Sequence, residues 1–308
     1  MRILHIEHRM NYKAIIACLL WGSAFAGAKI GFQYAEPLFL SGLRFTLAGL
    51  LLVPIIWWNK LDLKAALKHW KFMLLFAFMQ TFLQYGLFFL GLDKVPGATS
   101  SIIIGAGPLF VAIMAHLVLK NDKMTLRKTA SITLGMAGIV FISLTKGQLS
   151  GNSPVFYQGV ALLVLSNIIG SFTNIMVVQK KEAHINPVVL TAFANFTGGL
   201  LLLGTSLLVE KPAIKVYPTE FYGALLWLSF ISAAAFSLWY IELQKPGVKV
   251  SELNLWKFLV PVTGSILSWI LVAGESPDVT TVVGIVVISL SLVLQQANQL
   301  KRTKSIDR

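Results

Sequence analysis

Lys257 is the residue whose chemistry most needs an explanation, because its ammonium group falls within the long apolar segment 250–273. A charge in hydrocarbon costs at least ~2.5–3.5 kcal/mol and usually faces a protein interior or a cavity. Asn254 precedes Lys257 by three residues and Pro261 follows it by four, so all three would share one face of a helix. This face could bind an anionic group, and an internal ion pair with Glu252 or with a residue of another helix is the alternative.

Arg44 is a second cation within an apolar segment, 37–58, and follows Pro37 by about two helical turns. Its planar guanidinium can hold a carboxylate through two parallel hydrogen bonds, which makes it a candidate ligand for an anionic substrate. A structural role, in which the guanidinium binds neighbouring carbonyl groups, is equally compatible with its position.

Uncharged polar residues form a second set of candidate binding residues. Gln80 and Gln84 are four residues apart, with Tyr85 beside them, and Asn167 and Asn174 are seven apart, so each pair occupies one helix face. Polar groups in lipid need partners. We expect these residues to line a cavity, and hydrogen bonds between helices are the alternative.

Two tryptophans and two prolines complete the candidate site. Trp21 and Trp239 lie deep in their apolar segments, where they could contact an apolar part of a ligand or pack between helices. Pro108 and Pro261 lack the amide that a helix interior requires, so they predict helix breaks at which gates could bend.

Proton coupling would need a carboxylate that both sides of the membrane can reach in turn. Glu252 and Glu242 are the acidic candidates near the segments that carry the polar residues. Both could equally lie at a membrane interface, so the sequence leaves coupling undecided.

The composition shows what kind of element must position these residues. Of 308 residues, 56% are hydrophobic and 13% charged, against ~25% charged in soluble proteins, and mean hydropathy is +0.73. This composition excludes a soluble globular enzyme and predicts an all-α membrane protein. We expect ten transmembrane helices, each near the length that spans hydrocarbon, at 14–32, 37–58, 70–92, 97–119, 127–145, 157–179, 187–209, 219–243, 250–273 and 279–298.

The charge distribution predicts the orientation of these helices. The net charge is +13, and most of the 26 lysines and arginines fall in alternate loops and at both ends of the chain. Short cytoplasmic loops concentrate such residues, so both termini are expected in the cytoplasm, with the protein in the cytoplasmic membrane. The positive charge therefore reflects topology, and a nucleic-acid partner is not expected.

A weak internal repeat divides the chain. Asp122 follows Pro108 at the same spacing at which Glu275 follows Pro261, and the two pairs are offset by about half the chain. Five helices per repeat would place the second copy upside down, giving residues 1–150 and 151–308 as two inverted five-helix repeats with a binding site near the bilayer midplane. Chance coincidence of common membrane residues is the alternative.

Several short motifs, in their order and spacing, resemble those of the EamA-type drug/metabolite transporters. They are Trp21-Gly22-Ser23 with Phe25, Arg44-Phe45, the prolines at 108 and 261, and Gly274-Glu275. The first half departs from the usual Gly-Glu and reads Asn121-Asp122, which keeps the acidic character. The resemblance implies a transporter, often an exporter, of amino acids or other small metabolites.

The expected function is therefore secondary transport by alternating access, with lipid and a small-molecule substrate as partners and with an anionic group on that substrate favoured by Lys257 and Arg44. The sequence lacks a Walker-A loop, an H-E-x-x-H motif and a nucleophile with a matching base, so neither an enzyme nor a cofactor or metal is expected. A channel, or a membrane assembly or sensor protein that transports nothing, is the alternative. The oligomeric state is not encoded in any feature of the sequence.

Overall fold

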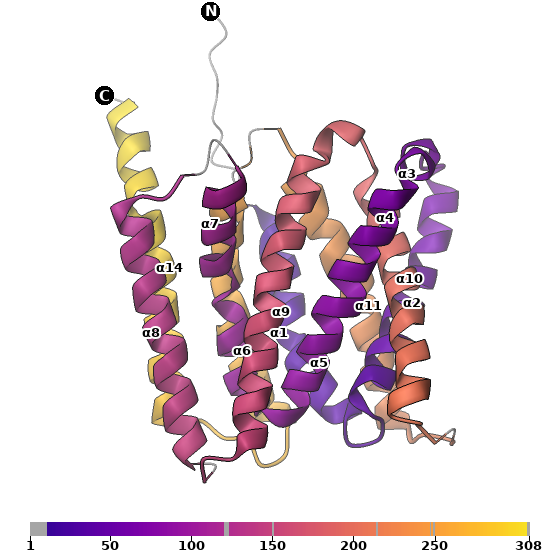
Figure 1. The fold of residues 1–308 in the computed structure, drawn as a ribbon, viewed down its shortest axis with the longest axis horizontal. Coiled ribbons are helices and arrows are strands. Elements are labelled where there is room, and N and C mark those ends of the chain that lie inside the picture. Colours follow the sequence, from indigo (N-terminus) through magenta and orange to yellow (C-terminus); the bar gives the residue numbers. More distant parts are fainter. Residues whose placement is uncertain are drawn as a thin grey trace, which may run out of the picture.

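A computed structural model describes residues 11–119, 123–149, 151–213, 215–246, 248 and 250–306, and this part of the chain forms helices joined by short loops (Figure 1). The elements are α1 (Tyr12–Gly31), α2 (Pro37–Trp58), α3 (Lys64–Lys68), α4 (Trp70–Ala77), the π-helix η1 (Phe78–Leu83), α5 (Gln84–Lys94), α6 (Gly97–Gly105), α7 (Gly107–Val118), α8 (Leu126–Leu149), α9 (Pro154–Gln179), the 3₁₀-helix η2 (Lys181–Ala183), α10 (Pro187–Val209), α11 (Thr219–Leu243), α12 (Val250–Asn254), the 3₁₀-helix η3 (Leu255–Phe258), α13 (Leu259–Leu271) and α14 (Val279–Ile306).

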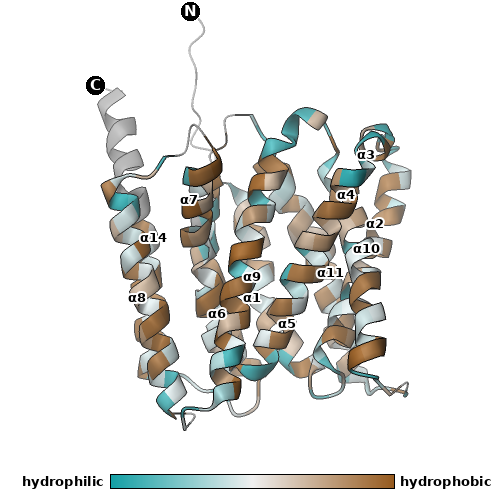
Figure 2. Ribbon diagram, in the orientation of Figure 1, coloured by the Kyte–Doolittle hydropathy of each residue, from teal (hydrophilic) through white to brown (hydrophobic). Residues whose placement is uncertain are grey.

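Eight helical segments in the described residues are long and apolar enough to cross a membrane. They correspond to the first eight expected spans, and at the ninth and tenth positions the apolar helices are shorter, Trp256–Leu271 and Val279–Ser291. The prediction of an all-α fold is confirmed for the described residues, and these apolar helices are consistent with a membrane protein. In Figure 2 the hydrophobic residues gather along the middle of the long helices, as side chains that face the hydrocarbon of a bilayer require.

The expected continuous helix at 250–273 is divided into α12, η3 and α13. Pro261 lacks an amide and cannot bond the carbonyl of Lys257, and the amide of Leu259 bonds instead to carbonyls of η3. A similar interruption falls at Ala106, between α6 and α7, with Pro108 in the first turn of α7, where a missing amide costs little. Both prolines therefore follow a helix break.

The long helices pack as two groups. In the α1 group, α1 packs against α11, η3 and α13, and α2 packs against α11. In the α9 group, α9 packs against α5, α6 and α7, and α10 packs against α4 and η1. Each group therefore contains helices from both the first and the second half of the chain.

The two groups meet most extensively along two seams, α2 against α10 and α6 against α13, with smaller contacts of α10 with α11 and of α2 with α5. Glycines allow the close approach: a Cβ on Gly49 would lie 2.6 Å from Cβ of Phe196, and one on Gly105 would lie 2.5 Å from Cδ of Pro261. The α6–α13 seam also contains a hydrogen bond of 3.1 Å between the hydroxyls of Ser101 and Ser265.

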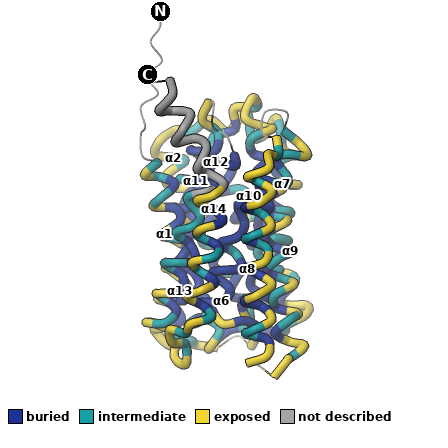
Figure 3. Tube along the Cα trace, turned by 90° about the vertical axis from the view of Figure 1, so that its left-hand side faces the viewer, coloured by how far each residue is buried: buried dark blue, intermediate teal, exposed yellow. Residues whose placement is uncertain are grey.

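Helices α8 and α14 form a separate pair beside the two groups, as Figure 1 shows at the left. Lys146 near the end of α8 forms an ion pair of 2.7 Å with Asp278, which precedes α14. In Figure 3, buried positions follow the interior of the bundle and exposed positions gather at both ends.

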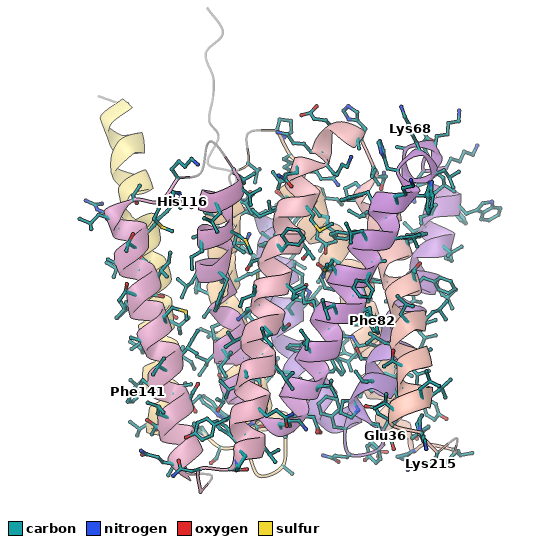
Figure 4. All side chains as sticks on the ribbon, in the orientation of Figure 1. Glu36, Lys68, Phe82, His116, Phe141 and Lys215 are labelled. Carbon is teal, nitrogen blue, oxygen red and sulfur yellow. The ribbon has the colours of Figure 1, made fainter. Side chains whose placement is uncertain are left out.

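Figure 4 distinguishes the two ends of the bundle. Lys68 and His116 lie at one end, which we call the Lys68 face, and Glu36 and Lys215 lie at the other, which we call the Glu36 face. Helix α1 ends and α2 begins at the Glu36 face.

Candidate functional site

A cavity of about 80 Å³ lies between the α1 group and the α9 group. One ordered water needs only ~10–15 Å³ by the same kind of measure, so several waters or a small solute fragment would fit. From the α1 group it is lined by Trp21, Ala24, Phe25, Arg44, Phe236, Trp239, Tyr240, Lys257 and Val260, and from the α9 group by Gln80, Gln84, Tyr85, Phe88, Ile104, Gly107, Val111, Ser166, Asn167, Gly170, Ser171 and Asn174.

The α1 group contributes both of the cations. Lys257 Nζ lies 4.8 Å from the ring centroid of Trp239 and 5.5 Å from that of Trp21, distances at which an aromatic face attracts a cation. Among the side chains that the structure describes, no carboxylate forms an ion pair with Lys257. Its position follows from η3, which turns the chain between α12 and α13.

Arg44 is 1% exposed and projects from the first half of α2. Its Nε and Nη2 atoms donate to Oγ of Ser232, at 3.1 and 2.8 Å, and its guanidinium lies 4.4 Å from the ring centroid of Phe45. Nη1 is buried without a hydrogen-bond partner, and no described carboxylate pairs with the guanidinium. A buried charged donor left unpaired is costly, so this atom is suited to an acceptor that a ligand would bring.

The α9 group contributes the carboxamides. Gln80 accepts a hydrogen bond of 2.7 Å from Oγ1 of Thr173, and Asn167 donates to the carbonyl of Ile103 at 2.7 Å. Gln84 leaves its buried Oε1 without a partner. This wall therefore carries both satisfied structural amides and one free acceptor.

One hydrogen bond joins the two walls of the cavity. Nε1 of Trp239 donates to Oδ1 of Asn174 at 2.9 Å, and Nδ2 of Asn174 donates to the carbonyl of Gly170 at 2.6 Å. Nε1 of Trp21 and the hydroxyl of Tyr240 are buried on the same cavity without partners.

Nine of the expected binding residues line this one cavity: Lys257, Arg44, Gln80, Gln84, Tyr85, Asn167, Asn174, Trp21 and Trp239. Asn254 is not among the lining residues, although it is fully buried, and its Nδ2 donates to the carbonyl of Val250 at 2.9 Å. The 3₁₀ turn that follows Asn254 changes the helical phase, so it does not keep the face of Lys257.

The remaining expected residues lie outside the cavity. Pro108 and Pro261 adjoin the helix breaks without lining it. Glu242 is 2% exposed and accepts hydrogen bonds of 2.7 and 2.6 Å from Lys245. Glu252 lies in α12, and its side chain falls outside the part of the chain that the structure describes.

Several further lining residues were not singled out as candidates by any pattern in the sequence. Tyr240 and Phe236 form an aromatic row with Tyr85, whose ring centroid lies 5.6 Å from that of Phe236. Ser171 lies one helical turn after Asn167, so the spacing that selected Asn167 and Asn174 could have found it. The aromatic residues carried no such signal, because aromatic side chains are common throughout apolar helices.

Comparison with known proteins identifies the family. The sequence model of the EamA-like transporter family matches residues 9–144 and again residues 158–295. The chain belongs to the EamA-like transporter family. As an EamA-like protein, it is a multi-pass member of a family of membrane transporters.

Relatives of this EamA-like protein extend over most of its length. An uncharacterized transporter of Archaeoglobus fulgidus is 26% identical over 285 residues, covering 92% of this chain and 96% of its own. The uncharacterized transporter YoaV of Bacillus subtilis is 24% identical, covering 83% and 86%. A crystal structure 18% identical in sequence aligns with a TM-score of 0.71 over 92% of this chain and 95% of that chain, which shows a shared fold.

Proposed function

We propose that this EamA-like protein is a secondary transporter that exports a small organic anion, such as an amino acid or another metabolite with a carboxylate, across the cytoplasmic membrane. The observation that carries the proposal is that Lys257 and Arg44 line one cavity without a carboxylate partner among the described side chains. Two unpaired cations in a low-dielectric site favour a ligand that brings negative charge.

The neutral part of the cavity favours an apolar body on that anion. The ring of Trp21 lies close to those of Phe236 and Trp239, with centroid distances of 5.3 and 5.2 Å. Aromatic walls with a few polar groups are typical of small-molecule sites. Gln84 Oε1 and the hydroxyl of Tyr240 could bind a further polar group of the ligand.

We further propose ten membrane-crossing segments in two inverted repeats, 1–150 and 151–308, with both termini and the Lys68 face in the cytoplasm. The two successive matches of the family model support a duplication. An odd number of crossings per repeat would invert the second copy. The lysines of α3 support a cytoplasmic Lys68 face.

Alternating access would then consist of the α1 group tilting against the α9 group, because the cavity lies between these groups. The helix breaks before Pro108 and Pro261 would serve as bending points on the two sides of the α6–α13 seam. Glu242, with Lys245 as its partner, and Glu252 remain the proposed candidates for proton coupling.

Counterflow into proteoliposomes tests the function. A mixed pool of labelled amino acids and organic acids would be supplied to wild type, Lys257→Gln and Arg44→Gln, with and without a pH gradient. The matched control is Lys64→Gln, which removes an exposed lysine of α3. Saturable exchange lost in the two cavity variants and kept in the control supports the proposal. Equal exchange in all four proteins, or conduction without counterflow, would indicate a different site or a channel.

A further inference from the structure

Glu210 at the end of α10 caps a helix of the other group. Its Oε1 and Oε2 accept hydrogen bonds from the backbone amides of Leu38 and Phe39, at 2.8 and 2.9 Å, in the first turn of α2. The hydroxyl of Ser206 donates to the same carboxylate at 2.7 Å and orients it. The contact joins the α9 group to the α1 group across the α2–α10 seam.

Glu275 makes the equivalent contact at the other seam. It follows α13 and accepts from the amides of Gly97 and Ala98, at 2.6 and 2.9 Å, in the first turn of α6. Gly274 has φ +82°, a backbone conformation that favours glycine and reverses the chain before Glu275. A Cβ on Gly97 would lie 3.2 Å from Oε1 of Glu275, so glycine keeps this approach open.

The two caps are reciprocal. The α9 group supplies Glu210 to a helix of the α1 group, and the α1 group supplies Glu275 to a helix of the α9 group. Both lie at the Glu36 face, where α2 and α6 begin. Any tilt that opens this face must separate both carboxylates from the amides that they cap.

These contacts replace caps that the helices lack. The first amides of a helix have no partner within the helix and favour an anion at that end. The residues that precede the two helices, Glu36 and Pro96, make no side-chain cap. Both capping carboxylates are only partly buried, so water can hydrate carboxylates and amides once they separate. This combination suits a contact that must form and break repeatedly.

We propose that Glu210 and Glu275 are paired latches that hold the Glu36 face closed over the cavity, one on each seam. The role of the latches rests on the proposed transport function, because they would provide the state of the transport cycle that is closed at the Glu36 face. Their existence can be tested without any substrate.

The test is labelling of a cysteine placed in the cavity. Cys18 is a buried cysteine, so Cys18→Ala with Ala24→Cys, a lining position on α1, gives a parent protein for an impermeant charged maleimide. Two reference variants identify the sides in reconstituted vesicles: Val216→Cys, 93% exposed in the α10–α11 loop, and Leu67→Cys, 70% exposed in α3. We compare Glu210→Gln, Glu275→Gln and the double variant with the matched control Glu220→Gln, an exposed glutamate on α11.

The double variant should be labelled from the Glu36 face about tenfold faster than the parent, since hydrogen bonds to charged groups are among the strongest in proteins. Single variants should fall between, and Glu220→Gln should match the parent. Unchanged labelling in the double variant overturns the proposal, and so does an equal gain from both faces, which would mean a loosened fold. Failure of anion counterflow in a protein with the expected labelling would contradict the transport function and leave the latches supported.

Discussion

The indole Nε1 of Trp239 donates to Oδ1 of Asn174 at 2.9 Å, and this bond crosses the cavity from the α1 group to the α9 group. The same indole lies over Nζ of Lys257, at 4.8 Å from ring centroid to nitrogen. Trp239 therefore links the cationic wall to the amide wall.

Trp239→Phe should keep an aromatic ring beside Lys257 and remove the donor to Asn174. The loss of one buried hydrogen bond corresponds to ~1 kcal/mol, or a change of about fivefold in an equilibrium. We expect the substrate concentration that gives half-maximal counterflow to change by about fivefold. A double-mutant cycle with Asn174→Ala checks the assignment, because fully additive effects would show that the two side chains act independently.

Arg44→Lys separates geometry from charge. Lysine keeps the positive charge and cannot reproduce two bonds to Ser232 together with a free third nitrogen. If Nη1 binds a carboxylate, KM for the anion should rise about tenfold or more. Purification as a monodisperse protein would control for folding, and wild-type kinetics in this variant would assign Arg44 a purely structural role.

The sequence patterns predicted the first eight spans and nine residues of the cavity, but not the 3₁₀ turn within the expected ninth span. Lys257 and Arg44 were recognisable because a charge within an apolar segment is rare and costly. Asn254 was placed on the face of Lys257 because a continuous α-helix was assumed, whereas η3 intervenes. Glu210 could not be found, since its partners are backbone amides 172 and 171 residues away and no side-chain pattern marks them.

Because α2 and α10 approach closely at their seam, we expect two glycine substitutions to differ strongly in their effect on stability. A Cβ on Gly49 would lie 2.7 Å from the backbone nitrogen of Phe196, whereas one on Gly223 meets nothing within 4 Å. Gly49→Ala should destabilise the protein by ~1–3 kcal/mol through overpacking. Gly223→Ala should be neutral or stabilising by up to ~1 kcal/mol, because alanine favours the helix. Unfolding in mixed micelles measures both, and equal stability would mean that the seam adjusts freely.

The ion pair of Asp278 with Lys146, which joins α8 and α14, should make the stability of the protein depend on pH. Burial alone would raise the pKa of Asp278, but hydrogen bonds from Lys146 and Thr281 outweigh it and hold the pKa below the ordinary 3.8. A carboxyl whose pKa is lowered by folding stabilises the protein above the unfolded pKa and loses this contribution as pH falls through the folded pKa.

As pH falls below about 4, wild type should therefore lose stability relative to Asp278→Asn. Above about pH 5 the difference in the free energy of unfolding between the two proteins should be constant. The side chain of Asp278 is 34% exposed and that of Lys146 is 17% exposed, so solvent screening should keep the effect below ~1 kcal/mol. The free energy of unfolding of both proteins across this range measures it. Because Asn keeps an acceptor for Thr281 and lacks the charge, parallel pH profiles would mean that the ion pair with Lys146 contributes no net stability.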